Sequence, residues 1–165
     1  MIADWIVQSA HQDSLLITLS MLKMAGRVCL WRYRIRTGNY AGFHLSADPA
    51  GCDQLLTLLG ALAKARTPRI GNVVLDPVTA DVLAVPNNPR GEISAYRHWD
   101  LAVDPAFDPE RLHFLVSNDR VRTELSTVQV ESLMAGIEDI RAGRGDYAIG
   151  DDDEHQLWFW WQNPR

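Results

Sequence analysis

The chain divides into segments whose apolar residues recur at every second position and segments whose apolar residues recur with a helical period. Residues 27–35 show the two-residue period of a half-buried strand. One face of this strand would carry Cys29, Trp31, Tyr33 and Ile35, and the other Val28, Leu30, Arg32 and Arg34. Turn-forming residues at 37–39 lead into a second strand at 42–46, which we expect to pair antiparallel with the first.

A helix is predicted to follow this pair of strands. Asp48 can accept an amide hydrogen bond at the start of a helix, and the ring of Pro49 suits the first helical turn. The apolar stripe of this helix consists of Cys52, Leu55, Leu56, Leu59 and Leu62. The helix is expected to end near Arg66, before a proline. A buried strand is predicted at 72–75, whereas 79–85 fits either a short helix or a strand.

The second half of the chain begins after residues 86–91, which form its strongest loop signal. Three apolar segments predict a meander of antiparallel strands at 99–103, 112–116 and 121–125. Ser126 and Gln129 have the spacing of a capping box at the start of a second helix. Its apolar stripe consists of Val130, Leu133, Met134, Ile137 and Ile140. Glycines at 143–145 should end this helix, and 157–161 is a strand by composition.

These elements predict a single α+β domain over 1–165, with largely antiparallel sheets and two main helices. The two apolar stripes have identical spacing, and each helix follows a strand that ends in Leu-Ser. This favours a tandem β-β-α-β repeat, or a β-β-β-α-β repeat if 15–24 is a strand instead of a helix. The halves would be 15–85 and 92–162, joined by the 86–91 loop. The alternative is that two unrelated amphipathic helices share the spacing by chance.

Composition narrows the classes of function. The chain has 165 residues, of which 47% are apolar, so it is long and apolar enough to bury one core without disulfides. Its 16 basic and 21 acidic residues give a net charge of -5, which argues against nucleic acid as a partner. No basic leader and no long apolar run is present, so we expect a cytoplasmic protein with no membrane partner. Cys29 and Cys52 fall on apolar positions and suggest no disulfide.

An acidic segment at 145–155 is the first candidate for chemistry. Its ionisable residues are Asp146, Asp151, Asp152, Asp153, Glu154 and His155. Oxygen-rich sets of this kind can bind a hard cation, which makes a small hydrolase or metal-dependent enzyme one hypothesis. The other interpretation is a charged turn that keeps the following apolar strand soluble. The five histidines lack the spacing of a zinc site, and we assign no catalytic residue, no cofactor and no metal.

The aromatic strand at 157–161 is the second candidate. Trp158 and Trp160 point to one face, whereas Trp161 points to the other together with two further apolar residues. A central strand covered on both faces explains this pattern. The functional alternative is an anchor for a protein partner, formed by Trp158, Trp160 and Trp161, to which Asp151, Asp152 and Asp153 steer a basic partner. A third hypothesis is a homodimer in which this strand pairs across a two-fold axis.

The last quarter of the chain resembles the small bacterial immunity proteins of polymorphic toxin systems. The resemblance is carried by the Gly-Arg-Gly-Asp-Tyr-Ala-Ile-Gly segment at 143–150 and by the Leu-Trp-Phe-Trp-Trp segment at 157–161. It implies a non-enzymatic protein that binds and blocks one toxin domain, commonly a basic nuclease, through an acidic surface. It assigns no individual residue to a site.

Overall fold

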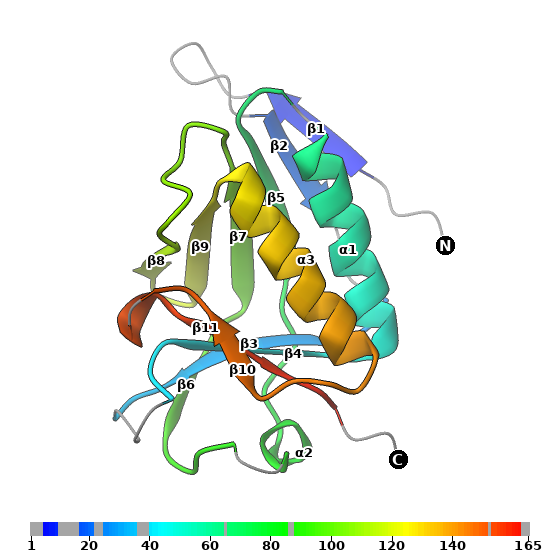
Figure 1. Ribbon diagram of the computed structural model, residues 1–165. Coiled ribbons are helices and arrows are strands. Elements are labelled where there is room, and N and C mark those ends of the chain that lie inside the picture. The colour runs from blue at the N-terminus through cyan, green and yellow to red at the C-terminus, as the bar shows by residue number, and fades with distance from the viewer. Residues whose placement is uncertain are drawn as a thin grey trace.

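The protein is an α+β fold in which two sheets and two long helices enclose one main core (Figure 1). The computed structural model describes residues 5–9, 17–21, 25–35, 40–64, 66–85, 88–151 and 153–162. In spatial order, the six-stranded sheet contains β1 (Trp5–Ser9), β2 (Ile17–Met21), β5 (Arg69–Val74), β7 (His98–Val103), β9 (Arg120–Leu125) and β8 (His113–Ser117). The five-stranded sheet contains β10 (Tyr147–Ile149), β11 (Leu157–Trp160), β4 (Phe43–Ala47), β3 (Val28–Tyr33) and β6 (Ile93–Ala95). The helices are α1 (Pro49–Ala63), the short α2 (Ala80–Leu83) and α3 (Thr127–Arg141), with a 3-10 turn, η1, at Asp153–His155.

The predicted α+β class and the two main helices are confirmed, but the strand order differs from the predicted meander. Strand β9 lies between β7 and β8, and it pairs parallel with β7 and antiparallel with β8. The apolar pattern predicts where each strand lies in the sequence but not which strand it pairs with. The loop at 104–112 is long enough to place β8 on the far side of β9. Parallel pairs also join β2 to β5 and β4 to β11, so both sheets are mixed.

The two long helices begin where their capping residues predict. Asp48 accepts a 2.7 Å hydrogen bond from the amide of Gly51, with a proline next to it at the first helical position. Ser126 and Gln129 form the reciprocal bonds of a capping box at the start of α3. Helix α1 ends at Ala63, slightly earlier than predicted. Local side chains therefore fix both starts.

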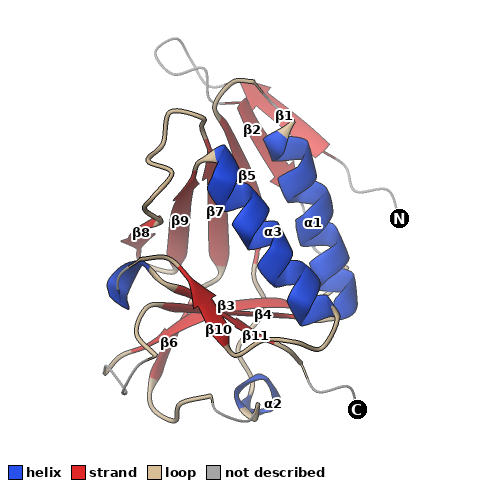
Figure 2. Ribbon diagram, in the orientation of Figure 1, coloured by secondary structure: helices blue, strands red, loops and turns tan. Residues whose placement is uncertain are grey.

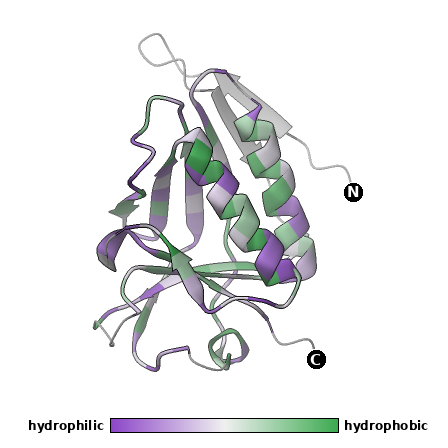
Figure 3. Ribbon diagram, viewed as in Figure 1, coloured by the Kyte–Doolittle hydropathy of each residue, from purple (hydrophilic) through white to green (hydrophobic). Residues whose placement is uncertain are grey.

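The main core lies between the helices and the inner faces of both sheets. Helices α1 and α3 lie side by side, and both alternate between hydrophobic and hydrophilic residues along their length (Figures 1 and 3). The β3 and β4 strands run across the direction of β7 and β9 (Figure 2). Leucines of α1 and apolar residues of α3 meet side chains from both sheets in one continuous cluster. Among the described residues, none of the helices combines the length and the hydrophobicity needed to cross a bilayer.

A second, smaller core covers the other face of the five-stranded sheet. It contains Cys29, Trp31, Val82, Val85 and Trp160, all buried. Residues 79–85, for which a helix and a strand were both expected, form α2 over 80–83 and supply the two valines. The five-stranded sheet is therefore apolar on both faces, which is why β4 is buried along its whole length.

The strand pairings do not confirm the predicted repeat. The described part of 15–24 is a strand, β2, but it pairs with β1 and β5, whereas its expected equivalent β7 pairs with β5 and β9. A different correspondence is present. If α2, β6 and η1 are left aside, the run β3-β4-α1-β5-β7 has the same order of elements as the run β8-β9-α3-β10-β11. Each sheet joins the first two strands of one run to the last two of the other, as β3-β4-β11-β10 and β8-β9-β7-β5, with matching directions.

Candidate functional site

The segment that carries the family resemblance builds a tight hairpin from β10 and β11. The amide of Asp146 donates a 2.8 Å hydrogen bond to the carbonyl oxygen of Phe159, close to Gly145. A Cβ atom at Gly145 would lie only 2.7 Å from that same oxygen. Gly150 has a φ of +109°, and a Cβ atom there would overlap the carbonyl oxygen of His155. These glycines therefore serve the close backbone contacts of the hairpin.

The aromatic strand β11 occupies a central position between β10 and β4. Trp160 is fully buried and therefore forms no part of an exposed surface. Trp158 is half-buried, and its indole N–H donates a 2.8 Å hydrogen bond to the carbonyl oxygen of Ala41. Trp161 is half-buried and packs against the second core. Both edges of β11 are occupied, which leaves none for pairing with a second copy.

A buried histidine lies among these tryptophans. The ring of His44 stacks on Trp31 and Trp160, with ring centroids 5.5 and 6.0 Å apart. Its Nδ1 accepts a 2.9 Å hydrogen bond from the indole N–H of Trp160. Its Nε2–H therefore donates to the carbonyl oxygen of Tyr40, at 3.2 Å. Burial lowers the pKa of His44 to about 4, so the ring is neutral at physiological pH.

The predicted acidic site is spread over several environments. Asp151 is exposed and faces Arg111 at 3.7 Å. The side chains of Asp152 and Asp153 lie outside the described residues. Asp146 occupies a turn with a φ of +69°, whereas Glu154 and His155 belong to η1. Within the described part of the chain, no three His, Cys, Asp or Glu side chains gather as a set of metal ligands.

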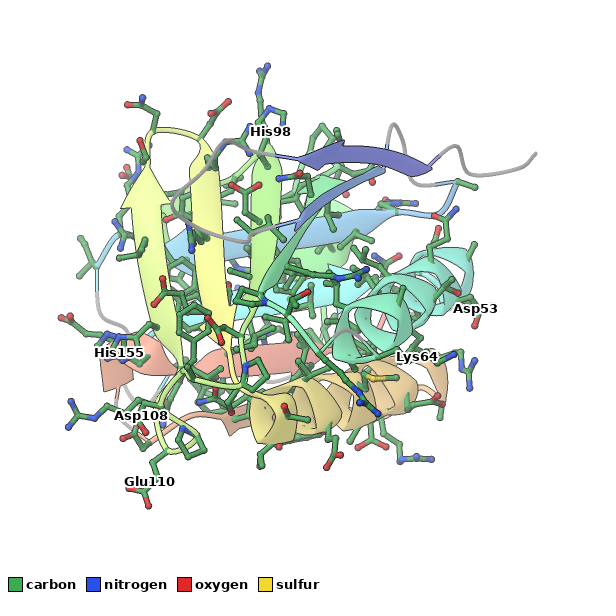
Figure 4. The ribbon with its side chains drawn as sticks, turned by 90° about the horizontal axis from the view of Figure 1, so that it is seen from above. Asp53, Lys64, His98, Asp108, Glu110 and His155 are labelled. Atoms are coloured by element: carbon green, nitrogen blue, oxygen red, sulfur yellow. The ribbon has the colours of Figure 1, made fainter. Side chains whose placement is uncertain are left out.

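A cleft of about 470 Å³ lies where the two sheets meet, at the end of the molecule that carries η1. His155 lines this cleft, and Figure 4 shows it on the opposite side of the molecule from Asp53 in α1. The rings of Phe43 and Phe114 stack 4.2 Å apart and join the two walls. The residues that line the cleft include Arg32, Arg34, Phe43, Ser94, Phe114, Val116, Glu154 and His155.

One wall of the cleft belongs to β8, the last strand of the six-stranded sheet. Strand β8 pairs with β9 on one side and has no described strand on the other. Two of its apolar side chains are unusually exposed, Leu115 at 54% and Val116 at 40%. The side chains of Phe114 and Val116 point to the cleft, and that of Leu115 points to the opposite face of the sheet.

The opposite wall is basic. Arg32 lies at the cleft end of β3 with its guanidinium carbon 6.0 Å from the centre of the Phe43 ring, within the range of a cation–π contact. Arg34 faces Glu92 at 3.6 Å, but both side chains are mostly exposed, so this pair is weak. None of the described carboxylates forms an ion pair with Arg32.

The sequence contains one signal for this cleft, a change from apolar to basic residues along β3, which by itself does not predict a site. On one face of β3, the apolar residues Val28 and Leu30 give way to Arg32 and Arg34. Such a change shows where a buried face opens to solvent. The opposite wall of the cleft comes from β8, about eighty residues away in the chain. No periodicity within one segment could bring the two together.

Comparison with protein-family models, with curated proteins and with solved structures finds no match to this chain.

Proposed function

We propose that this protein is a non-enzymatic protein-binding module of the immunity type, which binds its partner along strand β8. The observation that carries the proposal is the open edge of β8, with the exposed side chains of Leu115 and Val116 beside the cleft. An open edge offers unpaired N–H and C=O groups to an extended segment of another chain. Apolar side chains on the same strand add contact area.

A comparison within the molecule supports this mode of binding. Strand β3 holds the place in the five-stranded sheet that β8 holds in the six-stranded sheet. Its outer edge is covered by β6, which pairs antiparallel with it. The fold therefore accepts one further strand at this position, and a partner's segment would take the corresponding place beside β8.

Charge supports a basic partner. The chain carries a net charge of -5, and the acidic turn that includes Asp151 and Glu154 lies next to the cleft. Such a surface speeds encounter with a basic protein and has little effect on the final contacts. We further propose that the protein works in the bacterial cytoplasm, since Cys29 and Cys52 are both buried and unpaired. Burial raises the pKa of each thiol to about 12.

The test is affinity capture from the native host, followed by reconstitution with the purified captured protein. Changing Leu115 and Val116 together to Lys should weaken the reconstituted complex about tenfold or more, because two charges then occupy the pairing edge. Val74→Lys is the matched control, since Val74 is 40% exposed on β5, and β7 and β9 lie between β5 and β8. If the partner is a toxin domain, an equimolar amount of wild-type protein should block its activity. Equal binding by the edge variant and the wild type would disprove the proposal.

A further inference from the structure

We infer that the cleft receives the carboxylate of an Asp or Glu side chain from the partner segment that pairs with β8. This inference rests on the proposed function and adds the chemistry by which the segment is recognised. Three features of the cleft support it: a cationic group, access from the β8 edge, and a distribution of charge that favours one carboxylate.

Arg32 supplies the cationic group. Its guanidinium carbon lies 6.0 Å from the centre of the Phe43 ring, which itself stacks on Phe114, so the charge lies beside an aromatic support. Burial raises the pKa of the nearby Tyr96, and the charge of Arg32 opposes this rise. An arginine that stacks on a ring still presents its planar N–H groups to a carboxylate.

The geometry of β8 gives access. A strand added beside β8 alternates its side chains between the two faces of the sheet, as β8 does. Every second side chain of the added strand would thus point to the face that carries Phe114 and Val116, which is the face that lines the cleft. A Glu or Asp at one of these positions would reach toward Arg32, which lies on the opposite wall.

The two ends of the cleft limit the number of charges. Arg32, Arg34 and Ser94 lie on one side, whereas Glu154 of η1 also lines the cleft. A single carboxylate near the arginines is favoured, because the two arginines are the cationic groups on this side of the cleft. Together with the acidic turn, this arrangement fits a partner that is basic overall but has one acidic residue in its docking segment. That pattern would fix the register of the added strand.

The experiment uses the full chain and three short synthetic peptides with alternating Val and Thr. They differ only at the central position, which is Glu, Gln or Lys, and binding is followed by NMR shifts of residues in the cleft. We expect the Glu peptide to bind about 10- to 100-fold more tightly than the Gln peptide, and the Lys peptide to bind least. Arg32→Gln should remove this preference, whereas Arg97→Gln, at an exposed arginine outside the cleft, should keep it.

Two results would overturn the inference. The first is equal binding of the Glu and Gln peptides, or an unchanged preference in Arg32→Gln. The second is that N-acetylglutamate amide or inorganic phosphate binds as tightly as the Glu peptide, because the cleft would then hold a free anion without strand pairing. A different result would contradict the proposed function, namely that the variant with Lys at Leu115 and Val116 still binds the captured partner.

Discussion

The hairpins β3-β4 and β8-β9 occupy corresponding places in the two sheets, yet their surroundings differ. Strand β4 is buried along its whole length, whereas β8 has three exposed residues in succession. The five-stranded sheet is covered by the helices on one face, by the second core on the other, and by β6 along the edge of β3. In the described part of the chain, no strand covers the corresponding edge of β8. The same arrangement of strands thus supports a closed structural sheet and a sheet with an open edge.

The outer face of the six-stranded sheet shows the same contrast. Asp100 on β7 accepts 2.6 Å hydrogen bonds from Asn72 and from Arg120. On the five-stranded sheet, the corresponding layer consists of tryptophan, cysteine and valine. The outer face of one sheet is therefore covered by buried aromatic and aliphatic groups, and the outer face of the other carries polar pairs. Mutations on the outer face of the five-stranded sheet should therefore lower stability more than mutations on the outer face of the six-stranded sheet.

The largest expected effect is at Trp160. Trp160→Ala should lower the free energy of unfolding by about 4 kcal/mol, because it empties a fully buried site and leaves Nδ1 of His44 without its donor. Leu115→Ala, at the exposed edge, should change it by less than about 0.5 kcal/mol. Urea denaturation of both variants measures the difference. Similar losses in the two variants would contradict the contrast between the sheets.

The second prediction concerns acid. His44 is neutral when folded because burial holds its pKa at about 4, whereas in the unfolded chain it binds a proton near its ordinary value of 6.5. The unfolded state thus gains protons first as the pH falls, and the stability present above pH 6.5 is progressively lost. Between about pH 7.5 and pH 5, this loss should be about 2 kcal/mol.

Denaturation at several pH values measures this loss. The variant His44→Gln should unfold with a flatter pH dependence than the wild type over that interval, whatever its absolute stability. An identical pH dependence in the two proteins would show that the pKa of His44 is the same in the folded and the unfolded chain.

The third prediction compares one glycine from each helix, and its Gly60 variant has the smallest expected effect. A Cβ atom at Gly136 in α3 would overlap the ring of Phe159 on β11, so Gly136→Ala should cost about 2 kcal/mol. At Gly60 in α1, a Cβ atom would meet nothing within 4 Å, so Gly60→Ala should raise stability by about 0.5–1 kcal/mol. Thermal unfolding of the two variants provides the measurement. A gain of stability in Gly136→Ala would mean that α3 does not pack tightly on the five-stranded sheet, and a loss in Gly60→Ala would contradict the second expectation.

Sequence patterns predicted the features that depend on neighbouring residues. Both long helices were predicted from capping groups within three positions of each other, such as Ser126 and Gln129. The place of β9 between β7 and β8 was not predicted, because pairing depends on contacts across the whole chain. Of the two interpretations of the aromatic strand, its central position is confirmed, since β11 pairs with a strand on either side. The cleft was missed because its walls come from opposite halves of the sequence.

The exchange of strands between the two runs has a consequence for how the protein folds. Helix α1 leads from β4 in one sheet to β5 in the other, and α3 leads back from β9 to β10. Neither run can complete a sheet on its own, because the parallel pairs β4–β11 and β7–β9 each take one strand from each run. Folding must therefore wait for contacts between residues that are far apart in sequence, which makes the transition slow and cooperative. A ribosome that has released only the first half would hold a chain with no finished sheet.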